Sequence, residues 1–550
     1  MSSSSSRSYT ASRASSMIAS SEESVDETTQ LLPKQVDTEP EKGTKIYRLW
    51  QVGALFGILL AYADTSLVWA THETIASRFN SLQNSSWMMT SFTMGYCVTL
   101  PLYGRLSDNY GSLRPLLVAY CTFCIGSMLC GIGQTYWQVI LGRIIAGCGA
   151  SGMVSLASIV ITELADSSDV AVLRSYVNIA STIGLSGGGP LGGFLAGAVG
   201  WRWLFLGQVP IAAACCLLMA RSFESMCPKL EQQEDPQREE PALAFDFPGA
   251  ITLAIAISSL LVVIDLQGSL SWAHPLVQSI VAVGILSTLA FLVFETFPGN
   301  RELLMPLKLL KTEIGAFCAG QLLLVASGYG FVSQIAPYFA NTQGASDAEG
   351  GGRTAPFSIG NAIGALLAGQ IIKRQAAGFG TYKKLSLVSL FFCIANSVAI
   401  LLRWPHNIGV WEEIFTTLPF GLFGGIALSA QFIGLYQCSS KQYMATAISM
   451  YYMSQQIGVA LGISISSGLL KNQFHSTLQK IMTEVPGYTK EQIIRKILDD
   501  SSVVALLPEG IQTLVRQGYL HSFWVVPVFA VSTQALTILP MISTTERYSS

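Results

Sequence analysis

The sequence predicts an all-α polytopic membrane protein. Half of its 550 residues are hydrophobic, only 12% are charged, and the mean hydropathy is +0.46. Apolar stretches of about 20 residues recur along the chain, and each is long enough to cross a hydrocarbon core about 30 Å thick. No basic tract is dense enough to indicate nucleic-acid binding. The 11 cysteines lack zinc-type pairing with histidine, so no metal site is expected.

Residues 1–46 are predicted to be a disordered cytosolic tail, because they are rich in Ser, Thr and Glu and poor in apolar residues. The tail lacks the charged and apolar regions of a cleaved signal peptide. Within it, Glu27 precedes the pair Leu31-Leu32. This spacing resembles the acidic dileucine signal by which adaptor complexes sort membrane proteins to endosomes, lysosomes or the fungal vacuole. The alternative is an incidental leucine pair in a linker.

About fourteen apolar spans follow the tail. They fall near residues 50–71, 86–104, 114–133, 136–160, 174–199, 203–221, 247–266, 275–297, 312–340, 355–373, 384–402, 413–437, 442–469 and 521–541. Lys and Arg are richer in the short loops of one side, so both termini are expected in the cytosol. Residues 472–520 are predicted to form a polar loop on the far side, helical in part because Lys490–Leu498 has amphipathic spacing. Asn84 begins a glycosylation sequon on that same side, which predicts a glycoprotein.

Asp64 is a lone carboxylate inside the first span. A charge at that depth costs about 2.5–3.5 kcal/mol by insertion scales, so it marks an ion or substrate path. Desolvation favours the protonated form, which would let a proton and a cationic substrate compete for the same carboxylate. The alternative is that Asp64 bridges helices structurally. Asp265 and Glu295 end two later spans and are expected to be solvated.

Charged residues beside glycines mark candidate gating elements. The loop between the second and third spans can lock two helix bundles through ion pairs and a contact with a helix dipole. An arginine in the fourth span needs a partner inside the bundle, and glycines let helices approach closely. Gly and Pro in the fifth span permit bending or tight packing. These candidates are Gly104, Arg105, Asp108, Gly111, Arg114, Arg143, Gly147, Gly189, Pro190 and Gly193.

Together these motifs resemble the major facilitator superfamily, and more narrowly its fourteen-helix drug:proton antiporter branch. Residues 104–114 are similar to the signature loop G-x-L-x-D-x-x-G-R-K, and Arg143 with Gly147 is similar to the motif of helix four. Residues 189–193 look like the antiporter motif of helix five, and residues 201–205 look like the W-R-W-x-F that follows it. Ser112 and Leu113 replace the usual Arg or Lys, so the latch is expected to be weaker or rearranged.

The resemblance implies a major facilitator fold with two six-helix bundles, at residues 47–222 and 298–541. A cytosolic linker at 223–246 and two inserted spans at 247–297 would separate them, and 542–550 would form a cytosolic tail. The substrate site is expected between the bundles near the midplane. Beside Asp64, the polar candidates for that site are Asn178, Tyr329, Gln334, Asn361, Gln455 and Gln456. The alternative for each is a hydrogen bond that holds helices together.

Within that branch the chain most resembles the fungal vacuolar basic amino acid transporters. The resemblance predicts a monomeric transporter, not an enzyme, that exchanges lysine, arginine or histidine for protons across the vacuolar membrane. It implies no cofactor, with protons as the coupling ion, and its partners would be the lipid bilayer and a sorting adaptor. A plasma-membrane multidrug:proton exporter is the alternative, because it shares every motif except the sorting signal. A nutrient-sensing receptor that kept the fold is a second alternative.

Overall fold

The computed structural model describes residues 40–81, 84–164, 170–231, 244–266, 272–297, 301–344, 352–373, 382–406, 409–482, 490–499 and 508–544. Contacts divide the chain into two units, Met1–Arg48 and Leu49–Ser550. The predicted sorting signal at Glu27, Leu31 and Leu32 lies outside the described residues. The first helix begins at Pro40, inside the predicted tail, and continues into the second unit.

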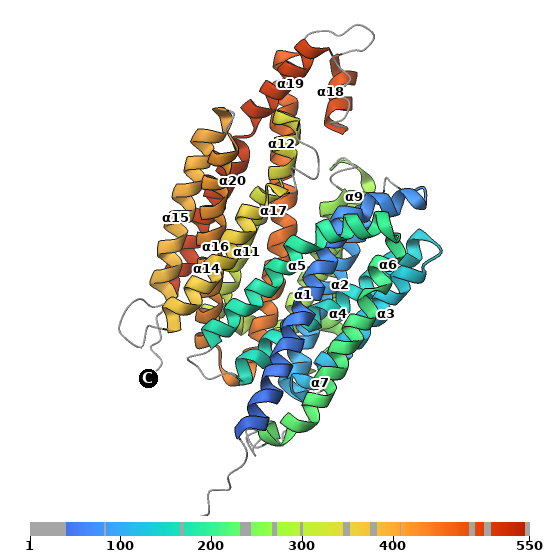
Figure 1. Cartoon of the computed structure of the whole chain (residues 1–550), viewed down its shortest axis with the longest axis vertical. Coiled ribbons are helices and arrows are strands. Elements are labelled where there is room, and N and C mark those ends of the chain that lie inside the picture. The colour runs from blue at the N-terminus through green and yellow to red at the C-terminus, as the bar shows by residue number, and fades with distance from the viewer. Residues whose placement is uncertain are drawn as a thin grey trace, which may run out of the picture. The chain divides into compact units, whose positions relative to one another are not determined.

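The first helices of the second unit form an N-terminal bundle, which Figure 1 shows in blue to green. Helix α3 packs on α4 and α7, and α2 packs on α4. The short helix α6 is followed after one residue by α7, and together they supply one crossing. The bounds are α1 Pro40–Arg78, α2 Trp87–Tyr110, α3 Leu113–Ile132, α4 Tyr136–Leu164, α5 Val170–Ala198, α6 Trp201–Leu206 and α7 Gln208–Glu231.

A C-terminal bundle follows, in yellow to red in Figure 1. Helix α14 packs on α16, α11 on α17 and α20, and α15 on α16. The bounds are α10 Leu307–Leu310, α11 Glu313–Val332, α12 Ile335–Gln343, α14 Ala355–Lys373, α15 Tyr382–Arg403, α16 Val410–Cys438, α17 Met444–Ile481, α18 Lys490–Asp499, α19 Glu509–Ser522 and α20 Val525–Ser543. Short 3₁₀ turns at Trp404–His406 and Lys441–Tyr443 precede α16 and α17.

Two inserted helices, α8 Phe247–Leu266 and α9 Pro275–Thr296, pack on each other, and α8 also packs on α2. A two-stranded parallel pair, β1 Ala244–Phe245 with β2 Arg301–Glu302, joins their ends. The expectation that Asp265 and Glu295 are solvated is wrong. Glu295 is only 3% exposed, and its Oε1 accepts a hydrogen bond from the Met305 N–H at 2.5 Å. Asp265 accepts a hydrogen bond from Thr90 of α2 at 2.9 Å, because α8 lies against that helix.

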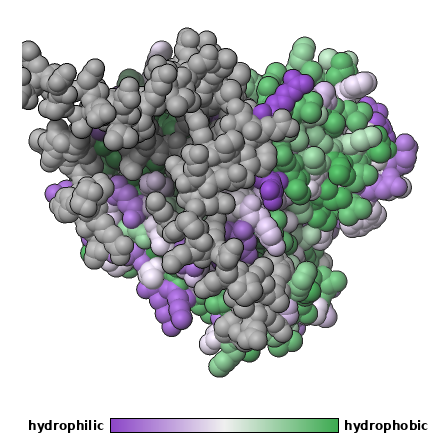
Figure 2. All heavy atoms as spheres, turned by 90° about the horizontal axis from the view of Figure 1, so that it is seen from below, coloured by the Kyte–Doolittle hydropathy of each residue, from purple (hydrophilic) through white to green (hydrophobic). Residues whose placement is uncertain are grey.

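The all-α polytopic class is confirmed. By length and composition, 11 helical stretches of the described chain can cross a membrane. Helices α2, α5 and α17 fall outside that set, although each has at least 24 residues, and adding them brings the number into line with about fourteen spans. Many large apolar side chains are exposed, including Phe194 at 72% and Leu286 at 70%, and Figure 2 shows hydrophobic residues along one flank. Such a surface suits lipid rather than water.

The three helices outside the apolar set share a location. Helix α2 packs on α17 and α5 packs on α14, so these helices join the two bundles. The bundles have two ends. At one, the Asp108 side, α2 ends and α17 begins; at the other, the Asn84 side, α1 ends and α2 begins. On the Asn84 side the predicted loop 472–520 is largely helical, since α17 runs to Ile481 and α18 and α19 follow. Apolar side chains of all three helices share one buried cluster with α11 and α12.

Candidate functional site

Asp64 forms a buried ion pair within the N-terminal bundle. Its Oδ2 lies 2.6 Å from a guanidinium nitrogen of Arg143 on α4, and both side chains are at most 1% exposed. Its Oδ1 accepts a hydrogen bond from Gln208 of α7 at 3.0 Å. The carboxylate is therefore fully partnered, and it does not present a free oxygen to a cavity. Gln208 escaped the sequence analysis, although a glutamine in an apolar helix is the same signal that singled out Gln455.

Arg143 joins this pair to the space between the bundles. Its Nε donates to the Met88 carbonyl at 3.3 Å, and its guanidinium lies 4.3 Å from the centre of the Phe92 ring. Arg143 also lines a pocket between α1, α2 and α4 of the N-terminal bundle and α17 of the C-terminal bundle. The pocket is lined by Thr65, Trp69, Met89, Phe92, Thr93, Tyr96, Arg143, Gln456 and Val459. Any change in the charge of Asp64 therefore changes the electrostatic potential in the pocket, because Arg143 contacts both.

Tyrosine side chains gather at the interface of the bundles near this pocket, and one of them, Tyr96, lines it. Tyr62 of α1 lies close enough to Tyr329 and Tyr452 to interact electrostatically, and it lies beside Gln455. Tyr96 of α2 lies beside Gln456, as Tyr62 lies beside Gln455. Neither the Tyr96 hydroxyl nor the Gln455 carbonyl oxygen has a hydrogen-bond partner among the described residues. Tyrosine faces and free acceptor oxygens suit a cationic ligand with N–H donors.

The structure separates the predicted site residues into two groups. Tyr329, Gln455 and Gln456 lie at the interface of the bundles with the tyrosines, and Asn178 of α5 donates to Ser429 of α16 across that interface at 3.4 Å. The other two lie inside the C-terminal bundle. Asn361 of α14 packs against α16 beside Gly425, and the buried Gln334 lies directly before α12 and donates to Ser333 at 3.1 Å. Tyr62, Tyr96 and Tyr452 were missed, because tyrosine is unremarkable in an apolar span.

The bundles are closed on the Asp108 side by contacts with α17. Asp108 accepts hydrogen bonds from the backbone N–H groups of Ala445 and Thr446 at 3.2 and 3.1 Å, and from the Thr446 hydroxyl. A carboxylate at the start of α17 matches the partial positive charge of that helix end. Gly104 lets α2 approach, since a Cβ there would lie 2.5 Å from the Ser449 hydroxyl. The predicted latch is therefore a contact between this loop and α17.

The altered residues of the loop are accommodated locally. Ser112 is buried and shares a 2.6 Å hydrogen bond with Ser107, and Arg105 lies close enough to Asp108 to interact with its charge. Gly111 has φ +77°, a left-handed conformation that favours glycine. Arg114 is exposed.

A second closing contact centres on Tyr452 of α17. Arg174 of α5 donates to the Tyr452 hydroxyl at 2.5 Å, and that hydroxyl also shares a 2.7 Å hydrogen bond with Ser158 of α4. The guanidinium of Arg174 lies 3.9 Å from the centre of the Phe432 ring on α16. Arg174 is 7% exposed, so these contacts exclude water between the bundles.

Glycines of α5 set the position of α1 beside Asp64. A Cβ at Gly184 or Gly188 would lie 2.4 or 2.3 Å from a backbone oxygen of α1, at Leu59 or Ala63. The packing residues are four apart and so share one helix face. The predicted Gly189 also faces α1 but less tightly, since a Cβ there would lie 3.4 Å from the Ser66 hydroxyl. A Cβ at the predicted Gly193 would meet nothing within 4 Å. Pro190 is exposed, whereas Gly147 of α4 packs closely on α2, since a Cβ there would lie 2.2 Å from the Phe92 carbonyl oxygen.

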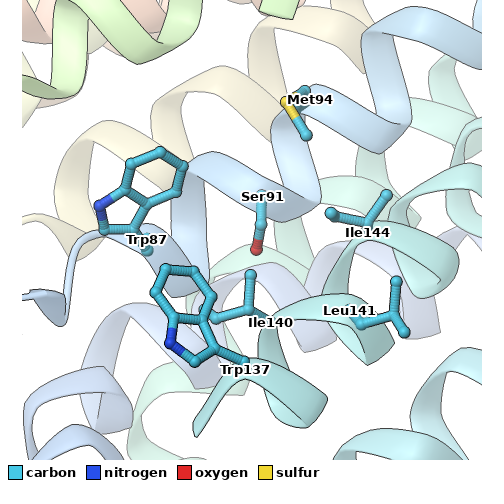
Figure 3. Close-up of a pocket in the computed structure, with 7 residues that line it drawn as sticks. All are labelled: Trp87, Ser91, Met94, Trp137, Ile140, Leu141 and Ile144. Atoms are coloured by element: carbon cyan, nitrogen blue, oxygen red, sulfur yellow. The ribbon is translucent and has the colours of Figure 1, made fainter. Parts of the chain in front are cut away.

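A hollow of about 290 Å³ also lies on the outer surface of α2 and α4. Figure 3 shows Trp87 and Trp137 at one end, with Ser91, Met94, Ile140, Leu141 and Ile144 beyond them. Trp137 and Leu141 are 64% and 54% exposed, and the polar side-chain groups of the lining are the Ser91 hydroxyl and the indole N–H groups of the two tryptophans. This apolar hollow suits lipid contact and lacks the chemistry of a substrate site. Among the residues described, no group of three His, Cys, Asp or Glu side chains could hold a metal ion.

The class of protein that this structure defines is a multi-pass secondary transporter. Such proteins have two helical bundles with a polar site between them, as here with the buried ion pair beside the pocket. The model of the Major Facilitator Superfamily matches residues 54–463, and the chain belongs to this superfamily of transporters. The major facilitator fold is thereby confirmed, as is the prediction that the protein is not an enzyme.

Three relatives indicate where the chain lies in the superfamily. It is 30% identical over 473 residues to the vacuolar membrane amino acid uptake transporter fnx2 of Schizosaccharomyces pombe, covering 85% of this chain and 79% of that protein. It is 26% identical to the multidrug resistance protein fnx1 of the same organism, covering 92% and 94%. It is 25% identical to the vacuolar basic amino acid transporter 2 of Saccharomyces cerevisiae, covering 80% and 92%.

Proposed function

We propose that this protein is a proton-coupled antiporter that moves basic amino acids into the vacuole, with the Asp108 side in the cytosol and the Asn84 side in the lumen. The names of two relatives, a vacuolar amino acid uptake transporter and a vacuolar basic amino acid transporter, support the substrate class and the location. The dileucine pair in the tail would direct the protein there through an adaptor complex. The observation that carries the coupling is the buried pair of Asp64 and Arg143 in the pocket wall.

The coupling follows from the charge of that pair. With Asp64 ionised, the pair is neutral. The pocket, about 40 Å³ in this structure, would then accept a cationic amino acid against its aromatic faces once the bundles move apart. When Asp64 takes a proton, the Arg143 charge is no longer compensated, and the pocket becomes positive. A positive pocket repels a cationic substrate, since like charges at low dielectric cost several kcal/mol (about 4 kcal/mol at 4 Å for an effective dielectric constant of 20). Proton and substrate therefore exclude each other without touching the same atom.

Closure of the two sides would alternate. Two contacts hold the Asp108 side shut in this structure: Asp108 of α2 with the start of α17, and Arg174 of α5 with Tyr452 of α17. Proton binding from an acidic lumen would release substrate there, and loss of the proton to the cytosol would restore the neutral pair. This order accumulates cations in the acidic compartment.

The test is uptake of radiolabelled lysine, arginine and histidine by vacuolar vesicles, with and without a proton gradient. We expect gradient-dependent uptake with the wild-type chain and none with Asp64→Asn, while the protein still reaches its membrane. Asp265→Asn is the matched control, because that carboxylate is also part-buried but binds Thr90 at 2.9 Å, away from the pocket lining. Normal uptake by Asp64→Asn would remove the pair from the mechanism.

The other candidate is a multidrug:proton exporter of the plasma membrane. The pocket observation that favours it is its aromatic and thioether lining, with Trp69, Phe92, Tyr96 and Met89. Drug resistance that depends on the chain, without any change in amino acid uptake, would establish this function instead.

A further inference from the structure

A second buried carboxylate lies in the C-terminal bundle, apart from the pocket. Glu413 stands in the first turn of α16, on the Asn84 side, and is 1% exposed. Neither of its carboxylate oxygens has a hydrogen-bond partner among the described residues. A buried carboxylate without hydrogen bonds is costly in its ionised form. The neutral acid is the cheaper state in such a place, so the site favours a bound proton.

The charge that faces Glu413 is Arg353, which lies just before α14. Its guanidinium nitrogen is 3.8 Å from Glu413 Oε2, too far for a hydrogen bond, and its side chain is 22% exposed. The same nitrogen donates to Gln343 of α12 at 2.7 Å, and the guanidinium lies 4.3 Å from the centre of the Phe339 ring. Arg353 is thus held by α12 whether or not Glu413 is ionised. Its side chain lies between solvent, to which it is partly exposed, and the buried carboxylate.

The other titratable groups nearby do not compensate Glu413. Tyr338 of α12 interacts with it electrostatically, but its hydroxyl donates to the Trp404 carbonyl at 2.8 Å. Glu412, the next residue on α16, has a half-exposed side chain and pairs with the exposed Arg403 at 3.1 Å. His406 is exposed. Two adjacent glutamates therefore differ in burial and partner, one solvated and paired, the other buried and weakly paired.

We propose that Glu413 is a second proton-binding site of the transporter, which exchanges its proton with the Asn84 side and loses its ion pair with Arg353 when it is protonated. The role in transport rests on the proposed proton coupling, but the binding of a proton does not. The pair connects α16 to the segment between α12 and α14, so its protonation would loosen the C-terminal bundle at that end. An acidic lumen would thereby act on both bundles, at Asp64 in one and at Glu413 in the other.

The first experiment measures protonation directly and needs no substrate. Purified protein in liposomes is stepped from neutral to mildly acidic pH, and the carboxylic-acid C=O band is followed by infrared difference spectroscopy. We expect Glu413→Gln to lose a band that the wild type and Glu412→Gln both show. An unchanged difference spectrum in Glu413→Gln would overturn the proposal.

Arg353→Gln provides a second variant in case Glu413→Gln does not fold. Removing the cation leaves the ionised form of Glu413 less stable, so its band should appear at higher pH than in the wild type. A band at the same pH would contradict the pairing. Because both measurements omit substrate, they remain valid if uptake assays show that basic amino acids are not transported. Where uptake is proton-driven, Glu413→Gln should weaken its dependence on the pH of the Asn84 side over the range of the band, leaving the part due to Asp64, and Glu412→Gln should preserve the full dependence.

Discussion

The ion pair of Asp64 and Arg143 makes a quantitative prediction about stability. Asp64→Asn removes one charge and leaves the Arg143 guanidinium buried with the Met88 carbonyl and the Phe92 ring as neighbours. Removing one partner of a buried pair costs about 3–5 kcal/mol, because the remaining charge is neither solvated nor paired. Each kcal/mol lowers Tm by about 2–4 °C for a domain of about 150–250 residues, the size of the N-terminal bundle. We therefore expect Asp64→Asn to melt about 6–20 °C below the wild type.

The double variant Asp64→Asn, Arg143→Gln separates this explanation from a general loss of packing. It removes both charges and keeps side chains of similar size, so it should recover most of the lost stability, since neutral replacements of buried pairs are often tolerated. The assay is thermal unfolding of the purified proteins in one detergent at one concentration. A single variant that melts with the wild type, or a double variant no more stable than the single, would refute the reasoning. The double variant should remain inactive in proton-driven uptake, because the pocket charge can no longer change.

Three further predictions concern the helix contacts and the tail. Gly188→Ala should impair folding and uptake, because its Cβ would lie 2.3 Å from the Ala63 carbonyl, whereas Gly193→Ala, with open space around it, should match the wild type in melting and uptake assays; equal behaviour of the two would contradict the close packing of α5 on α1. Tyr452→Phe removes the hydroxyl that binds Arg174 and Ser158, a loss of about 1.5–3 kcal/mol that should raise opening on the Asp108 side about 10- to 150-fold. A cysteine placed at the buried Ser449 should then react faster with a membrane-impermeant maleimide from that side, and an unchanged rate would remove Tyr452 from the closure. Alanine at both Leu31 and Leu32 should move a fluorescent fusion to the cell surface, and persistent vacuolar signal would exclude the dileucine pair as the sorting determinant.

The predictions that held are those that depend on local composition. The number of spans follows from the lengths of the apolar stretches, because each must cross the hydrocarbon core. A charge within a span stands out wherever its partner lies, because the membrane makes an unpaired charge costly. Asp64, Arg143 and Asp108 were therefore found from the sequence. Their partners were not: Arg143 and Gln208 are 79 and 144 residues from Asp64 along the chain. A pairing over such distances is decided by how helices pack.

The sequence by itself thus determined a multi-pass helical protein and marked the charged residues within its spans, because hydropathy and the cost of buried charge act at each residue. The tertiary structure decided what each charge does. It turned Asp64 from a free carboxylate into one member of a pair, selected Gly184 and Gly188 over Gly193 for packing, and buried Glu413 while it left Glu412 in solvent. The physical reason is that burial and partners depend on which face of a helix meets its neighbours, and only the packed structure specifies that face.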